Sequence, residues 1–301
     1  MAYKIAIIGQ FQQGKSTLLN ALLAESFADI GEGLPTTHAI GEYCFGKEGD
    51  PVNVFDKKSH IPTDYDLSEY LKLDRNKEPL KSVTKVRFRL PKKSLSEIEL
   101  VDTPGFDASG PDGAADAAIA EAAIDSADFL LLLAPNTQLD EGYEGTKGYI
   151  KLIRRCCDSG KPFSVVINCK GSAKEKKWDP LGNDDIVATI QAQIQQDGGA
   201  PAPIDGHSPI WTCNAAWAWY ASAAVDPSAL GGRAKERFDA IHDDLDRHFK
   251  GKVDVDQIRQ LSRIDPLRDF LTGQGLTSCS VPTLLKLRSA WTDYRKAIVG
   301  D

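Results

Sequence analysis

Eight residues near the start of the chain have the types and spacing of a phosphate-binding loop. The pattern GxxxxGK[ST] is matched from Gly9 to Ser16, which read GQFQQGKS. Glycine lets the backbone turn sharply and approach phosphate oxygens, and a helix that begins there adds favourable partial charge. Such loops place a lysine, here Lys15, on the β- and γ-phosphates and a hydroxyl, here that of Ser16, on magnesium. The predicted nucleotide-binding residues of this loop are Gly9, Gln12, Gln13, Gly14, Lys15, Ser16 and Thr17.

A second motif follows a short apolar stretch and reads Asp102-Thr103-Pro104-Gly105. An acidic residue at the end of a strand can hold magnesium through water, and Asp102 occupies that place. Gly105 can offer an unobstructed backbone N–H to a γ-phosphate. A turn of this kind is common by itself, but after a phosphate-binding loop it indicates the metal side of a nucleotide site.

A third motif, LPTT, ends at Thr37 and precedes the next strand signal. A threonine in this loop can close over magnesium and the γ-phosphate, so that the loop responds to hydrolysis. Thr37 is the expected ligand, and Thr36 is the alternative. The predicted cofactor is therefore Mg²⁺, with Ser16, Thr37 and Asp102 as the metal-binding residues.

The three motifs together resemble the translation-factor-related class of GTPases. More narrowly, GQFQQGKSTLLNALL is similar to the GxFSSGKSTLxNALL stretch of bacterial dynamin-like proteins, and LPTT and IELVDTPGF fit the same family. The resemblance covers residues 3–45 and 82–219. It implies a GTPase (G) domain with a central mixed sheet that binds guanine nucleotide with magnesium. It also implies a nucleotide-dependent homodimer formed across the nucleotide face.

The resemblance also implies a set of catalytic residues, which are Gln12, Lys15, Thr37 and Gly105. Gln12 stands where dynamins have the residue that positions the catalytic water, although family members usually carry a small polar pair at residues 12 and 13. The alternative for Gln12 is a solvated loop residue. Phe106 follows the DTPG motif, so the water-orienting glutamine of Ras-like proteins is absent.

The base-reading motif [N/T]KxD of this class is incomplete. After a buried strand the chain reads Asn168-Cys169-Lys170-Gly171-Ser172, so the carboxylate is missing whether the motif starts at Asn168 or at Cys169. Asn168 and Lys170 are nevertheless expected to line the base site. Asn214 and Ala215 stand where the family has a short loop whose backbone touches the base. The aromatic residues just after them are expected to pack in the core or an interface.

These motifs require strands that end, and helices that begin, at one edge of a sheet. Alternating patterns predict strands over 3–8, 39–45, 82–90, 98–101, 129–133, 163–168 and 209–213. Helical patterns predict helices over 16–24, 113–126, 145–156, 184–196, 232–249, 255–271 and 281–299. This alternation indicates an α/β fold, namely a P-loop NTPase G domain with a mostly parallel central sheet and helices on both faces.

The predicted domains are a G domain over 1–225 and a helical C-terminal segment over 226–301 that packs on it. The polar stretch over about 47–81 is interpreted as an irregular insertion at the domain edge.

The composition of the chain argues against several other classes of protein. The 36 basic and 43 acidic residues give a net charge of −7, which argues against nucleic acid as the main partner. The six cysteines lack CxxC spacing, so buried free thiols are expected. The longest apolar run, Phe129 to Ala134, is too short to span a bilayer, and the start lacks a signal peptide. A cytoplasmic protein is expected, and the sequence does not indicate membrane association.

The predicted function is magnesium-dependent binding of GTP and GDP and hydrolysis of GTP, as a switch or a self-assembling GTPase. Two alternatives stay open. The incomplete [N/T]KxD motif suggests a P-loop hydrolase with relaxed or adenine preference. Phe106 and the unusual Gln12 suggest a nucleotide-binding interaction protein with negligible turnover.

Overall fold

The structure is a computed structural model of the chain. It describes residues 2–10, 13–23, 39–56, 60–61, 83–105, 113–136, 144–170, 184–196, 210–230 and 232–272. Gln12, Thr36, Thr37 and Phe106 lie outside the described residues, as does the helix predicted over 281–299.

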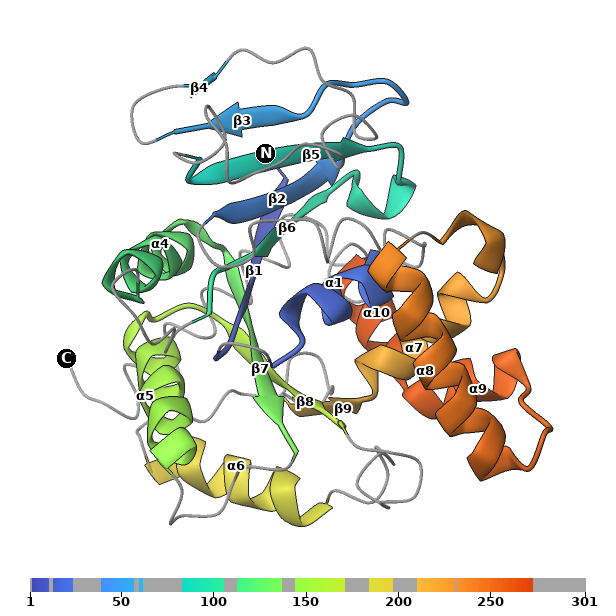
Figure 1. Ribbon diagram of the computed structural model, residues 1–301. Helices are drawn as coiled ribbons and strands as arrows, with labels where there is room; N and C mark the ends of the chain where they lie inside the picture. The colour runs from blue at the N-terminus through green and yellow to red at the C-terminus, as the bar shows by residue number, and fades with distance from the viewer. Residues whose placement is uncertain are drawn as a thin grey trace.

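The described strands form one sheet of nine strands in the order β4-β3-β5-β2-β6-β1-β7-β8-β9 (Figure 1). Their bounds are β1 (Tyr3–Ile8), β2 (Ile40–Phe45), β3 (Asn53–Phe55), β4 (His60–Ile61), β5 (Lys85–Leu90), β6 (Ile98–Asp102), β7 (Phe129–Pro135), β8 (Phe163–Asn168) and β9 (Ile210–Cys213). The pairings β1–β6, β1–β7, β2–β5, β7–β8 and β8–β9 are parallel, whereas β2–β6, β3–β4 and β3–β5 are antiparallel. The sheet is therefore mostly parallel, as predicted.

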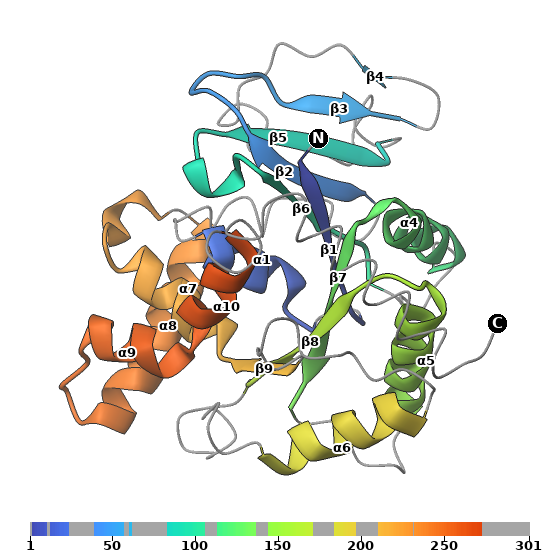
Figure 2. The same ribbon diagram turned by 180° about the vertical axis from the view of Figure 1, so that it is seen from behind.

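Helices cover both faces of the sheet. Their bounds are α1 (Lys15–Leu23), α4 (Gly113–Ser126), α5 (Glu144–Asp158), α6 (Asp184–Gln196), α7 (Ala215–Ala223), α8 (Gly232–Phe249), α9 (Val255–Ser262) and α10 (Ile264–Thr272). Figures 1 and 2 show α4, α5 and α6 on one face and α1 with α7 to α10 on the other. The predicted α/β class is confirmed.

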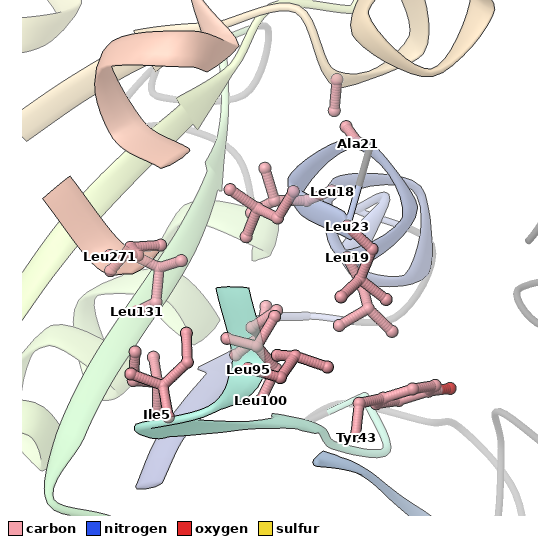
Figure 3. Close-up of a cluster of buried hydrophobic side chains, with 14 of the residues drawn as sticks. Ile5, Leu18, Leu19, Ala21, Leu23, Tyr43, Leu95, Leu100, Leu131 and Leu271 are labelled. Carbon is pink, nitrogen blue, oxygen red and sulfur yellow. The ribbon is translucent and has the colours of Figure 1, made fainter. Parts of the chain in front are cut away.

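Two hydrophobic layers hold this arrangement together. Along β1, Ile5 and Ile7 belong to the cluster under α1 and α10, whereas Ala6 and Ile8 belong to the cluster under α4, α5 and α6. Successive side chains of a strand point to opposite faces, so a strand buried on both faces is apolar throughout. Figure 3 shows Ile5, Leu131 and Leu271 across from Leu18, Leu19 and Leu23 of α1 in the first layer.

One long predicted helix is in fact two. Arg263 adopts the left-handed backbone conformation (φ 55°) between α9 and α10, and its N–H donates to Gln260 O. A left-handed residue ends a helix, so the prediction of a continuous helix over 255–271 was wrong. Pro266 lies in the first turn of α10, where its missing N–H is tolerated. That proline was the sequence signal of the break.

The pattern of the sequence did not predict α7. Nearly all of its side chains are buried, and a helix that is apolar on all sides has no amphipathic period to recognise. The Asn214 side chain begins this helix by accepting a hydrogen bond from Trp217 N at 3.0 Å. Trp217, Trp219 and Tyr220 are buried, which confirms the expectation that they pack in the core.

The stretch over 47–81 was expected to be irregular, and this was wrong for its short strands. Strand β3 pairs with β5, and β4 pairs with β3, at one end of the sheet. The described cysteines are free, and Cys156, Cys169 and Cys213 are buried, as expected. No helix of the described part is both long and apolar enough to cross a membrane.

The last described helix packs directly on α1 and the sheet. Arg268 donates to Leu22 O at 3.0 Å and to Ala21 O at 2.6 Å, which satisfies carbonyls at the end of α1. Phe270 packs against the rings of Phe129 and Trp211, with centroid distances of 6.1 Å and 5.2 Å. Helix α10 therefore shares one core with α1 and the sheet.

We expect Phe270→Ala to lower the free energy of unfolding by about 3–5 kcal/mol, because the lost ring leaves a cavity between α10 and the sheet. Urea unfolding followed by circular dichroism measures this loss. The control is Val225→Ala at a side chain that is 86% exposed, where a change below about 0.5 kcal/mol is expected. Equal, small losses for both variants would show that α10 does not contribute to the core.

Candidate functional site

The predicted phosphate loop lies between β1 and α1, as its chemistry requires. Gly14 has a left-handed backbone (φ 94°), which favours glycine. A Cβ at Gly9 would lie 3.0 Å from Leu133 O, and one at Gly14 would lie 2.8 Å from Asn168 Nδ2. Both glycines of the motif are therefore required by close packing against β7 and β8.

The Lys15 side chain lies across this loop. Its Nζ donates to Gly9 O at 3.2 Å and to Gln10 O at 2.9 Å, and the residue is buried. Burial lowers the pKa of Lys15, and the negative charge of Asp102 partly offsets this effect. A buried ammonium group whose hydrogen bonds go to carbonyl oxygens would gain strongly from a phosphate anion.

Ser16 and Asp102 meet at the start of α1. Ser16 Oγ donates to Asp102 Oδ2 at 2.8 Å, and Asp102 Oδ1 is buried without a hydrogen-bond partner. Burial raises the pKa of Asp102, although Lys15, Ser16 and the Thr103 backbone oppose it. A buried carboxylate oxygen without a donor is costly. A hydroxyl and a carboxylate are ligands that magnesium prefers, so this pair fits the predicted metal. The described residues hold no cluster of three His, Cys, Asp or Glu side chains for another metal.

A hydrogen bond to β1 holds the turn that follows Asp102 in place. Thr103 Oγ1 donates to Ile7 O at 2.9 Å, which joins the end of β6 to β1. Gly105, predicted to face the γ-phosphate, is buried two residues beyond Thr103. The motif therefore stands at the same sheet edge as the phosphate loop.

Asn168, at the end of β8, joins two loops. Its Nδ2 donates to Gln13 O at 3.0 Å, and its Oδ1 accepts from Ala215 N at 3.2 Å. The predicted residue thus lies against the phosphate loop, and its amide holds Gln13 and Ala215 in fixed positions. Asn214 is buried, and its side chain caps α7.

Lys170 also packs on the phosphate loop. Its Cε would lie 3.4 Å from a Cβ at Gly14, and its backbone N–H donates to Asn136 Oδ1 at 3.0 Å. Burial lowers the pKa of Lys170 from its ordinary value of 10.5 to about 8, and the charges of Arg237 and Lys15 add to this shift. The side chain therefore lies beside the phosphate loop, and its role in binding the base stays a prediction.

Two residues of this region were not predicted. Asn136 follows β7, the strand that pairs with β8, so its place at the carboxyl end of a parallel strand could have identified it. Arg237 of α8 donates from Nη2 to Thr17 Oγ1 at 2.7 Å. No local pattern indicates Arg237, because 220 residues separate it from Thr17.

The structure thus brings most of the predicted site residues to one edge of the sheet. They are Gly9, Gln13, Gly14, Lys15, Ser16, Thr17, Asp102, Gly105, Asn168, Lys170, Asn214 and Ala215. Gln12 and Thr37 lie outside the described residues, so their roles stay predictions.

Comparisons with known proteins agree with this geometry. The model of the Dynamin family matches residues 5–142, which contain the phosphate loop and the DTPG motif. A protein of Caldicellulosiruptor sp. (strain Rt8B.4), described as an uncharacterized protein in the xynA 3' region, is 32% identical over 108 residues. That match spans 35% of this chain and 26% of that protein.

Dynamin-like protein 2 of Campylobacter jejuni subsp. jejuni serotype O:23/36 (strain 81-176) is 34% identical over 108 residues, or 36% of this chain and 17% of that protein. The fold is similar to a solved chain of an oligomerised bacterial dynamin pair described as sensing and tethering membranes over long range. The TM-score is 0.50 at 16% identity, over 99% of this chain and 47% of that chain.

The fold and the phosphate loop are those of a P-loop G domain. The resemblance to bacterial dynamin-like GTPases is confirmed, because the model of the Dynamin family matches residues 5–142.

The lowered pKa of Lys170 makes stability depend on pH. Between about pH 8 and 10.5 the unfolded chain binds the Lys170 proton and the folded chain releases it, so stability contributed by this group rises with pH there. We expect Lys170→Met to be more stable than wild type at pH 7 and to lose this advantage by pH 10.5. Denaturant unfolding at both pH values measures the difference, with exposed Lys252→Met as the control. The same gap at both pH values would contradict the assignment.

Proposed function

We propose that this chain binds GTP with magnesium and hydrolyses its γ-phosphate. The observation that carries the proposal is the arrangement of Lys15, Ser16 and Asp102 around the start of α1. It combines a buried cation, a hydroxyl and a carboxylate oxygen without a partner at a helix N-terminus, where anions bind. The resemblance to dynamin-like proteins supports guanine nucleotide as the ligand.

In this proposal Lys15 turns from the loop carbonyls to the β- and γ-phosphates. Ser16 and Thr37 would hold magnesium, with Asp102 acting through water; when bound, the ion neutralises charge on the phosphate oxygens. The N–H of Gly105 would face the γ-phosphate, and Gln12 would position the attacking water. Catalysis of this type depends on positioning and on stabilisation of charge.

The base would lie over the loops that follow β8 and β9. Asn168 and Lys170 lie beside Gly14, and Ala215, which follows Asn214, donates its N–H to Asn168 Oδ1. Ligands of such sheets bind at the carboxyl ends of the strands. Self-association across the nucleotide face remains part of the proposal, supported by the oligomerised bacterial dynamin pair of similar fold. Relaxed base preference and negligible turnover are the alternatives, and comparison of GTP with ATP and measurement of phosphate release separate them.

Lys15→Ala is expected to abolish triphosphate binding, because it removes the buried cation of the phosphate loop. Isothermal titration calorimetry with GTP and magnesium measures this loss, and phosphate release measures turnover in parallel. The control is Lys252→Ala at an exposed lysine, which should bind GTP like wild type. Unchanged affinity in Lys15→Ala would remove the phosphate loop from the proposed site.

Asp102→Ala is expected to weaken magnesium-dependent binding of GTP more than binding of GDP without metal. The reason is that the carboxylate acts on the metal, whereas Lys15 and the loop N–H groups bind phosphate directly. Titrations of both ligands, with magnesium or with a chelator, measure the two losses. Equal losses for the two ligands would show that Asp102 supports the loop and not the metal.

A further inference from the structure

The guanidinium group of Arg237 lies beside the proposed nucleotide site. Its Nη2 donates to Thr17 Oγ1 at 2.7 Å, in the first turn of α1. Its central carbon lies 5.2 Å from the centre of the Trp219 ring, and Trp219 is buried in α7. A hydrogen bond from one side and an aromatic face from the other therefore hold the planar group in one orientation.

Arg237 also lies close to the base side of the phosphate loop. Its charge acts on Lys170, whose side chain packs against Gly14. Thr17 follows the two loop residues, Lys15 and Ser16, that are proposed to hold phosphate and metal. Helix α8 thus places a cation between the phosphate loop and the loops after β8 and β9.

Three cationic side chains, those of Lys15, Lys170 and Arg237, lie around this side of the phosphate loop. The charges that act on Lys170 come from Arg237 and Lys15, and both oppose its protonation. Charged donors of this kind form their strongest hydrogen bonds with groups that offer acceptor atoms. The triphosphate is proposed to meet Lys15, which leaves Arg237 and Lys170 on the side where the base is proposed to lie.

Guanine and adenine differ on the edge that such a cation would read. Guanine presents two acceptors, O6 and N7, whereas adenine presents one acceptor, N7, beside an amino donor. A guanidinium group has donors and no acceptor. It can therefore pair with the guanine edge in a bidentate manner, while one of its donors would face the adenine amino group. The carboxylate that normally reads the opposite edge is missing at Gly171 and Ser172.

We propose that Arg237 is a specificity-determining residue that selects guanine by donating to its O6 and N7 edge. The inference rests on the proposed nucleotide function and adds to it the group that distinguishes the base. Arg237 on α8 would then distinguish guanine from adenine in place of the carboxylate that is missing after β8. Lys170 would add a further donor.

The test compares the affinities of GTP, ITP and ATP by calorimetry. ITP keeps O6 and N7 but lacks the exocyclic amine, so wild type should bind it within about threefold of GTP, and ATP about 5- to 100-fold more weakly. Arg237→Lys keeps the charge and loses the planar fork. It should lower GTP and ITP affinity by a similar factor of about 5 to 100 and leave ATP within about twofold.

Arg237→Ala should give the same pattern, and Arg247→Ala is the matched control. Arg247 is an exposed arginine of α8 whose Nε donates to Asp243 O, away from Thr17. The GTP-to-ATP ratio separates base reading from support of the fold, since general destabilisation would weaken all three ligands alike. Equal losses for GTP and ATP in both Arg237 variants would overturn the inference, as would wild-type ITP affinity as low as that for ATP. Failure of wild type to bind any of the three would instead overturn the proposed function.

Discussion

The side-chain amide of Asn168 is the interaction on which the rest of the site depends. It donates to Gln13 O of the phosphate loop and accepts from Ala215 N at the start of α7, so one buried residue ties together elements that start from β1, β8 and β9. A Cβ at Gly14 would lie only 2.8 Å from its Nδ2, which together with the left-handed backbone explains why the loop carries glycine there. Because buried amide groups must be paired, this contact fixes the distance between the phosphate loop and the base loops.

Charge is arranged around this contact in two zones. On one side, the cation of Lys15 and the carboxylate of Asp102 offset each other, and Ser16 bonds to that carboxylate. On the other side, burial lowers the pKa of Lys170, and the charges of Arg237 and Lys15 add to this shift. In the proposed function, the first zone would bind a metal and a phosphate, and the second zone would bind a neutral group rich in acceptors. A nucleotide has these two ends in this order.

Local patterns predicted most of the fold. The bounds of β1, α4, α6, β8 and α8 agree with the predictions. Strands β1 and β8 are clear apolar runs, helices α6 and α8 have a clear apolar period, and α4 is an alanine-rich stretch. The misses have physical causes. Helix α7 is buried on nearly all sides and has no period, and the left-handed Arg263 divides a stretch whose apolar period is continuous. The short strands β3 and β4 form by pairing beyond β5, and pairing is not visible in a polar sequence.

The sequence by itself determined the chemistry of the site. The order and spacing of GQFQQGKS, LPTT and DTPG predicted a phosphate loop, a metal and a dynamin-like G domain, because each motif combines residue types that the chemistry requires over a few positions. The tertiary structure alone decided which distant residues complete that site. Asn168 reaches Gln13 across 155 residues, and Arg237 reaches Thr17 across 220. Such contacts arise from strand order and helix packing, so they cannot be predicted from the spacing of residues within a local motif.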